Sequence, residues 1–320
     1  MKRFTGCAAI VAGVLISVAA QAETWPSRII KAVVPFGAGS ATDVVPRLVF
    51  EKIGAELGQP ITVENRAGAG GTVGSTAVAR AEPDGYTLMA HSSAHTIAPS
   101  IFTDIKYDPA KDFSSVLMIG YSANVMITSP SKPWKTVQEF VAAAKDKNAA
   151  MTFGSVGVGS AVHISAEKFK LAAGFDATHV PYRGGSEVIS DILGGRIDFY
   201  FCPLSTALPL IKGGQVRALV ISTDKRSAEL PDIPTPLEAG YKNGETAIWF
   251  GVFMPSKTPR DIVEKFYAAG SKVLATPEMQ KDLRRLGVDP LPMTPSQMDE
   301  FVGRELAANA ALVKAAGIKQ

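Results

Sequence analysis

Residues 151–169, MTFGSVGVGSAVHISAEKF, decide the fold class of this chain. They read as a short strand, a turn of alternating glycines and the start of a helix. Glycine permits positive φ and carries no Cβ, so backbone N–H groups at such a turn can approach a negatively charged group. A second stretch of the same kind, VVPFGAGSATDVVPRL at 33–48, lies upstream. Two such units predict an α/β fold, and the glycine turns are candidate binding sites for a negatively charged ligand.

The first 22 residues have the composition of a cleavable export signal. Lys2 and Arg3 precede an apolar run over 8–20, and AQA at 20–22 is a small-x-small cleavage site. A membrane anchor is the alternative, but the run is shorter than the roughly 20 apolar residues that a spanning helix needs. Cys7 lies before the apolar run, where a lipid-attachment cysteine would not be. We therefore expect an exported, soluble protein.

Charge and cysteine content narrow the class of protein. Without residues 1–22 the chain has 298 residues, with 31 Lys and Arg against 30 Asp and Glu. This balance gives no reason to expect a nucleic-acid or membrane-surface partner. Only Cys202 would remain, so no intramolecular disulfide could form. With 46% hydrophobic residues, a chain of this length can instead build the cores of about two domains.

Strand-like runs alternate with helix signals, which is typical of parallel α/β sheets covered by helices. Asp43 or Thr42 is predicted to cap the helix after the first glycine turn, and Gly58 to end it. The spacing of Val45, Leu48, Val49 and Ile53 predicts that they lie on one face of this helix. Thr136 and Glu139 form a capping box for another helix. Ten strands are predicted, at 29–34, 61–64, 86–90, 116–119, 125–128, 151–153, 178–180, 197–201, 216–222 and 248–253.

The C-terminal part of the chain has a different pattern. Threonine precedes proline at 258–259, 276–277 and 294–295, which predicts three capped helices in succession without intervening strands. Polar or small residues at 121–124 and 242–247 suit two crossings between domains. A cleft between two lobes is a common place for a small-molecule site. The expected organisation is an export signal at 1–22, a discontinuous domain 1 at 23–122 plus 246–320, and an inserted domain 2 at 123–245.

The two glycine turns suit an anion better than a nucleotide. The first N–H groups of a helix lack intrahelical partners, and the helix dipole adds partial positive charge there. Neither turn, nor GAGGTVG at 68–74, matches G-x-G-x-x-G, and the chain has no G-x-x-x-x-G-K-[ST] motif. Ser40, Ser155 and Ser160 add hydroxyl donors, which suit a carboxylate. Ordinary helix caps are the alternative for either turn alone, and the presence of two favours a ligand.

A third segment, HVPYRGGSEV at 179–188, offers further binding candidates. Tyr182 and Arg183 would lie at the carboxyl edge of a strand, where α/β proteins bind ligands. The Arg183 guanidinium could form a bidentate pair with a carboxylate. An ion pair with Glu187, four residues later, is an equally good interpretation.

Signals for chemistry are weak. His91 and His95 have the i, i+4 spacing of a metal pair, but no third ligand is near, so no metal is expected. His163 either reaches the cleft or packs against its turn. The chain has no G-x-S-x-G motif, and Cys202 fits a buried, inert thiol better than a nucleophile.

From Trp25 to the C-terminus the chain resembles the periplasmic substrate-binding proteins of tripartite tricarboxylate transporters, the Bug-type proteins. The resemblance rests on seven segments, none of which is specific for the family alone but which together, in order, span the chain after the export signal. The segments that carry the resemblance are VVPFGAGSATDVVPRL, VENRAGAGGTVG, EPDGYTLM, FGSVGVGSAVHISAEKF, HVPYRGGSEVISDILGGRIDF, RALVISTDKRSAELPDIPTPLEAGY and IWFGVFMPSKTP.

The resemblance implies a type II-like periplasmic binding protein, with two Rossmann-like α/β lobes that are joined by two hinge strands and close over a small organic anion. It implies that a ligand carboxylate is held by the first strand–helix loop, often through water, and by the glycine–serine turn of the other lobe. The expected ligand-binding residues are Phe36, Gly39, Ser40, Thr42, Ser92, Ser93, Ser155, Gly159, Ser160, His163, Tyr182, Arg183 and Cys202.

Two departures from the family pattern bear on the ligand. The first loop has Gly39-Ser40-Ala41 where the family commonly has Pro-Gly-Gly or Ala-Gly-Gly before Ser-Thr-Asp. Cys202 stands where many relatives have an aspartate, which could pair with a ligand ammonium group. The hypothesis is therefore a ligand without an amino group, an aliphatic or aromatic mono- or dicarboxylate.

The expected function is ligand capture and delivery to membrane transporter subunits, by a monomer that has no cofactor and catalyses no reaction. Two alternatives stay open at this point. One is a secreted hydrolase or transferase on a similar two-lobed scaffold, and the other is a binding protein that serves a sensor.

Overall fold

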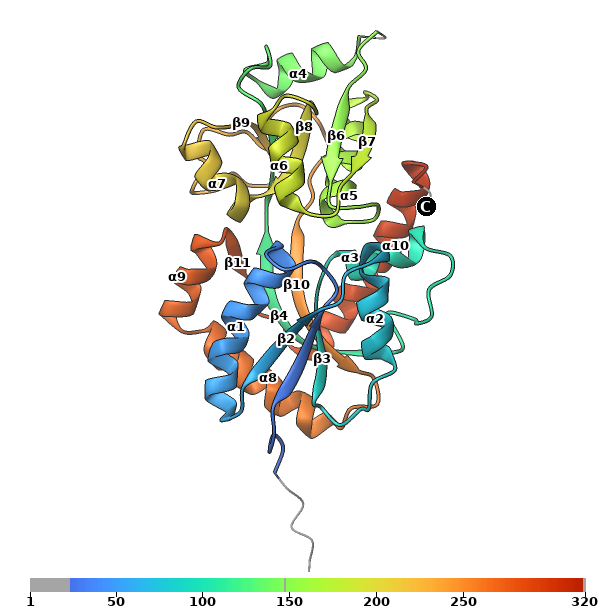
Figure 1. Cartoon of the computed structure of the whole chain (residues 1–320), viewed down its shortest axis with the longest axis vertical. Coiled ribbons are helices and arrows are strands. Elements are labelled where there is room, and N and C mark those ends of the chain that lie inside the picture. Colours follow the sequence, from blue (N-terminus) through green and yellow to red (C-terminus); the bar gives the residue numbers. More distant parts are fainter. Residues whose placement is uncertain (1–23, 147, 319–320) are drawn as a thin grey trace, which may run out of the picture.

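The structure, a computed structural model, describes residues 24–146 and 148–318. The predicted export signal at 1–22 lies outside the described residues. Figure 1 shows two α/β lobes, one above the other, each built on its own sheet. The α/β fold class expected from the alternating strands and helices is confirmed. No helix in the described part of the chain is both long and apolar enough to span a bilayer.

The first lobe is built on a six-stranded sheet of order β11-β4-β10-β3-β1-β2. β1 runs parallel to β2 and β3, whereas β10 is antiparallel to β3 and β4. The strands are β1 (Ile30–Val34), β2 (Ile61–Asn65), β3 (Thr87–Ser92), β4 (Phe113–Ser122), β10 (Ile248–Pro255) and β11 (Val288–Pro290). The helices are α1 (Ala41–Leu57), η1 (Ala69–Gly71), α2 (Thr72–Ala79), α3 (Ala94–Ile101), α8 (Arg260–Leu274), α9 (Pro277–Arg285) and α10 (Pro295–Ala315).

The second lobe is built on a five-stranded sheet of order β7-β6-β8-β5-β9. β6 is parallel to β7 and β8, and β5 is antiparallel to β8 and β9. The strands are β5 (Asn124–Thr128), β6 (Thr152–Ser155), β7 (Thr178–Pro181), β8 (Phe199–Pro203) and β9 (Arg217–Ile221). The helices are α4 (Val137–Ala144), α5 (Ala161–Ala173), α6 (Gly185–Leu193) and α7 (Leu204–Lys212).

Two segments carry the chain between the sheets. Ala123 alone separates β4 from β5, and the return segment follows β9 and leads into β10. Ser222 joins the two crossings: its N–H donates to the carbonyl of Asn124, and its hydroxyl donates to the carbonyl of Thr246, both at 2.7 Å. The crossings therefore lie side by side.

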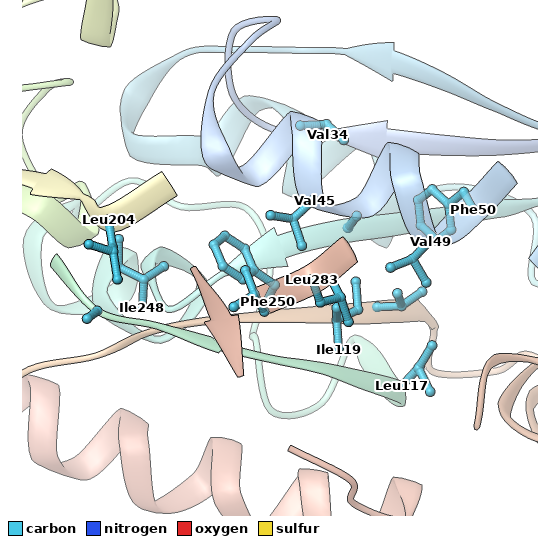
Figure 2. Close-up of a cluster of buried hydrophobic side chains, with 14 of the residues drawn as sticks. Val34, Val45, Val49, Phe50, Leu117, Ile119, Leu204, Ile248, Phe250 and Leu283 are labelled. Atoms are coloured by element: carbon cyan, nitrogen blue, oxygen red, sulfur yellow. The ribbon is translucent and has the colours of Figure 1, made fainter. Parts of the chain in front are cut away.

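Apolar side chains of α1 face the sheet of the first lobe, as the spacing of Val45, Val49 and Ile53 predicts. Figure 2 shows Val45 and Val49 on the side of α1 that faces the strands, while the Phe50 ring packs against Phe266 of α8 with 6.4 Å between ring centroids. These residues are fully buried, and each such side chain contributes about 1.5–3 kcal/mol relative to an exposed one. The second lobe has a separate core, rich in phenylalanine, between its sheet and α4 and α5.

Sheet topology differs from the prediction in two respects. All ten predicted strands are present, and β4 is longer than predicted by three residues at each end. The sheets are mixed rather than parallel, because β10 and β5, which follow the crossings, enter antiparallel to their neighbours. The prediction of three C-terminal helices without a strand between them is wrong. β11 lies between α9 and α10 and pairs with the end of β4, and three residues are too few to show strand periodicity.

Helix caps are confirmed at some predicted positions and not at others. Thr136, Thr276 and Thr294 each accept a hydrogen bond from the backbone N–H three residues later. The prediction for Thr258 is wrong, because α8 begins at Arg260 after Pro259. The prediction that Asp43 or Thr42 caps α1 is also wrong: the helix begins at Ala41, and Ser40 is its N-cap.

Candidate functional site

The first turn, residues 35–40, connects β1 to α1. The N–H of Ser40 donates to the carbonyl of Gly37 at 3.2 Å, and Gly39 has a φ of +78°, which favours glycine. The Ser40 hydroxyl oxygen is buried without a hydrogen-bond partner among the described residues. Phe36 lies within the turn, and Thr42 is the second residue of α1. The N-terminus of α1 thus presents an unused hydroxyl together with its first backbone N–H groups.

Asp43 holds this turn in place although it caps no helix. Its carboxylate accepts hydrogen bonds from the N–H of Gly39 at 2.9 Å, Asn65 Nδ2 at 2.8 Å and Arg47 Nε at 2.8 Å. Burial alone would raise the pKa of Asp43, but these hydrogen bonds outweigh it and lower the pKa. Asn65 also donates to the Phe36 carbonyl at 2.9 Å, so β2 and α1 together fix the turn.

We expect Asp43→Asn to lower the free energy of unfolding by about 2 kcal/mol, because an amide cannot accept from three donors around it. The measurement is urea unfolding at pH 7. Asp261→Asn is the matched control, since Asp261 lies exposed in the first turn of α8. An equal decrease in the free energy of unfolding in the two variants would contradict the role of Asp43 in holding the first turn.

Ser92 and Ser93 lie next to the first turn, because β3 pairs with β1 in parallel and both end at the same edge. Both serines are buried. The Ser92 N–H donates to Nδ1 of His91 at 2.8 Å, and the Ser93 N–H donates to the Trp249 carbonyl at 3.1 Å. The Phe36 ring lies 5.7 Å from the His91 ring, so the two loops are in contact.

The second turn, residues 156–160, connects β6 to α5 in the other lobe, and the hydroxyls of Ser155, the last residue of β6, and Ser160 bond within that lobe. Ser155 Oγ donates to the Gly157 carbonyl at 3.0 Å and is bonded to Nε2 of His179 at 2.6 Å. Ser160 Oγ donates to the same carbonyl at 2.7 Å and caps α5. In this arrangement the hydroxyl hydrogens of Ser155 and Ser160 are used inside the lobe.

His163 packs behind the second turn, which was the second of the two placements left open. Its Nδ1 accepts from the N–H of Gly159 at 3.2 Å, and its ring stacks on His179 at 4.0 Å between centroids. Burial, with smaller contributions from His179 and Lys170, lowers the pKa of His163 to about 3. The imidazole is therefore neutral, as an acceptor from Gly159 must be.

The sequence predicts unpaired backbone amides at the two helix starts, and the structure identifies the residues that supply them. They open the two helices and have no acceptor in their own helix: Ala41 and Thr42 in α1, and Ala161 and Val162 in α5. With the Gly159 N–H and the Ser160 hydroxyl already used, these amides are the better anion donors. Assigning them required the helix start, which a search for polar side chains does not give.

Tyr182 and Arg183 lie at the end of β7. Tyr182 donates to Asp191 Oδ2 at 2.5 Å, and burial together with this bond raises the pKa of the phenol to about 12. The Arg183 side chain is exposed, and Glu187 accepts from the Arg183 backbone N–H at 3.1 Å. An open depression of 470 Å³ adjoins Tyr182 and α6. A larger one of 730 Å³ lies along α1 and β2, away from the turns.

Cys202 is fully buried on β8 among apolar side chains, and burial raises the pKa of its thiol far above the ordinary value. The structure therefore places the thiol in a core and not on an open surface. His91 and His95 are also fully buried. No group of three or more potential metal ligands occurs in residues 24–146 and 148–318.

Comparisons with known proteins identify a family of binding proteins with this two-lobed α/β fold. The model of the tripartite tricarboxylate transporter family receptor matches residues 45–318. Protein BugT of Bordetella pertussis (strain Tohama I) is 32% identical over 306 residues, which cover 95% of this chain and 94% of that protein.

Two solved structures are similar in fold and sequence. The periplasmic binding protein BugD superposes with a TM-score of 0.86 at 33% identity, covering 92% of this chain and 100% of that chain. An R. palustris protein solved with adipate gives 0.88 at 32% identity, with the same coverage. These matches span nearly the whole described chain and confirm the expected resemblance. The chain belongs to the tripartite tricarboxylate transporter receptor family, whose members include periplasmic solute-binding proteins.

Proposed function

We propose that this protein captures a small organic carboxylate between its lobes and delivers it to a membrane transporter, acting in the periplasm as a monomer without a cofactor. One observation carries the proposal. Each lobe has a strand–turn–helix unit whose helix opens with unpaired backbone N–H groups, and the first of these units adds the unused Ser40 hydroxyl. These donors suit a carboxylate group. The resemblance to a protein solved with adipate supports the same ligand class.

The turns favour a ligand without an ammonium group. Asp43 is the acidic residue of the first turn's helix start, and three donors already engage its carboxylate. The second turn and its helix start carry no acidic residue before Glu167, which pairs with Lys170 at 3.0 Å. An ammonium group would lose its hydration without gaining an ionic partner. This argument replaces the one from Cys202, whose thiol lies in the core.

We expect adipate, succinate or phthalate to raise the melting temperature of the protein more than aspartate or glutamate at equal concentration. A ligand at 100 times its Kd stabilises the folded state by about 2.7 kcal/mol, which shifts Tm by several degrees in a chain of this size. Calorimetry then gives the affinities. Tighter binding of the amino acids would contradict the proposed ligand class.

Recovery of the ligand distinguishes binding from catalysis. A binding protein returns the acid unchanged after prolonged incubation, whereas a secreted hydrolase or transferase would convert it. The enzyme alternative also requires turnover that Cys202→Ala or His163→Ala abolishes, and both side chains are buried here. A sensor-associated protein would bind in the same way, so transport itself is tested by uptake of the radiolabelled acid in cells lacking the gene.

A further inference from the structure

A third turn, residues 68–71, takes an unusual backbone conformation. All four residues have positive φ: 143° at Gly68, 44° at Ala69, 62° at Gly70 and 98° at Gly71. Positive φ is costly for a residue with a Cβ, so Ala69 is held there by its surroundings. The function described above assigns no role to this GAGG sequence.

The third turn lies against both loops of the first-lobe site. A Cβ on Gly71 would be 2.9 Å from Nε2 of His91 and 3.4 Å from Cβ of Pro35. His91 is the residue whose Nδ1 accepts from Ser92, and Pro35 begins the first turn. The close approach therefore requires glycine, and the third turn supports both loops from behind.

The same turn reaches the second lobe through Phe102. A Cβ on Gly70 would be 2.6 Å from Cε2 of Phe102 and 3.2 Å from the Val158 carbonyl oxygen in the second turn. A Cβ on Gly159 would be 3.3 Å from the same Cε2 atom and 3.1 Å from Cδ1 of Ile101. The Phe102 ring thus lies between two glycines with positive φ, one from each lobe.

An apolar cluster surrounds this ring. It combines residues of α3 and α10 in the first lobe with Val158 and Ile164 in the second, and Phe102 is only 7% exposed. Asn309 of α10 donates to Thr96 Oγ1 of α3 at 2.9 Å, which fixes the two helices to one another. Figure 1 shows α10 running beside α3 toward the second lobe. The second turn therefore packs against a pair of joined helices in the other lobe.

We infer that Phe102, seated between Gly70 and Gly159, is a positioning residue that holds the second turn against the first lobe and so sets the affinity of the site between them. A contact made only when the lobes approach favours that arrangement over a more open one. The role of Phe102 in affinity rests on the proposed function. Its role in the spacing of the lobes does not.

The test measures the distance between the lobes without ligand. Spin labels on Glu51→Cys in α1 and Leu193→Cys in α6 report it by pulsed electron resonance, because both positions are exposed and the buried Cys202 is not labelled. We expect Phe102→Ala and Gly70→Ala to shift the distance distribution to longer values. Phe102→Leu, which keeps an apolar contact, restores it in part. Adipate affinity, measured by calorimetry, falls about tenfold in Phe102→Ala.

Gly58→Ala is the matched control for backbone strain. Gly58 has a φ of +73°, close to that of Gly70, but a Cβ there meets nothing within 4 Å. It should lower Tm without moving the labels. An unchanged distance distribution in Phe102→Ala, or an equal shift in Gly58→Ala, would overturn the inference. If the distance shifts but no carboxylate binds even the wild type, the proposed function fails while the positioning role stands.

Discussion

Replacement of Gly159 by valine abolishes carboxylate binding, with an expected loss of at least about 100-fold in affinity. Gly159 has a φ of +77°, which a β-branched residue adopts only with strain. Its added Cβ would also lie 3.1 Å from Ile101 and 3.3 Å from Phe102, in the other lobe. Either the backbone of the second turn or the spacing of the lobes must change. Both changes move the amides of Ala161 and Val162 away from the ligand.

Calorimetry with adipate measures this loss, and urea unfolding checks that the variant is folded. Gly214→Val serves as the control in the same lobe: Gly214 has a φ of +67°, but a Cβ there has no neighbour within 4 Å. Gly214→Val should lower the free energy of unfolding about as much as Gly159→Val does, and it should leave the affinity for adipate unchanged. If Gly159→Val kept wild-type affinity, the second turn would be purely structural, and the proposed site would have to lie elsewhere.

The fold was predictable because its signals are local. Strand–turn–helix units with glycine at the turn, and apolar residues such as Val45 and Val49 on one helix face, depend on neighbours in sequence. β11 was missed because its three residues become a strand only by pairing with residues 120–122 of β4, far away in the chain. Thr258 failed as a cap because Pro259 takes that position, and a TP dipeptide does not distinguish the two.

The sequence predicted the elements that form the candidate site, but not which of their polar groups are already hydrogen-bonded. The glycine turns join strands to helices as the sequence predicts, and Ser92 and Ser93 lie at the end of β3. The sequence did not show that Ser155 and Ser160 bond to the Gly157 carbonyl, nor that His179 reaches Ser155 from β7. Those contacts depend on strand pairing in three dimensions. Residue type indicates that a hydroxyl is present, and only geometry shows whether its hydrogen is already used.

Acidification from pH 7 to pH 4.5 is the second change with a large expected effect, because all four histidines of the chain lie in two pairs that burial keeps neutral. Burial first, and then the neighbouring His95, lowers the pKa of His91 well below its ordinary value. Burial likewise lowers the pKa of His95 to about 4, of His163 to about 3 and of His179 to about 4.

The direction in which pH changes the free energy of unfolding depends on how many protons the folded and unfolded chains bind. Unfolded histidine titrates near pH 6.5, so between that pH and about 4 the unfolded chain binds protons that the folded chain does not. The free energy of unfolding therefore falls as pH falls through this window. For His95 alone the loss approaches about 3 kcal/mol at pH 4. Glu167, 3.8 Å from His163, opposes the effect there, while Lys170 reinforces it.

Protonation would also disrupt the turns themselves. His91 Nδ1 accepts from Ser92 and His163 Nδ1 accepts from Gly159, and a protonated imidazole cannot accept either bond.

Urea unfolding midpoints at pH 7, 6, 5 and 4.5 measure the loss of stability. His95→Phe is the control variant, because the His95 ring packs against Tyr107, Phe113 and Phe253 and a phenyl ring suits those neighbours. Its free energy of unfolding should fall less steeply with decreasing pH than that of the wild type, because the contribution of His95 is removed. A wild-type stability that stays constant from pH 7 to 4.5, or an equal slope in His95→Phe, would show that these imidazoles are not held neutral by the fold.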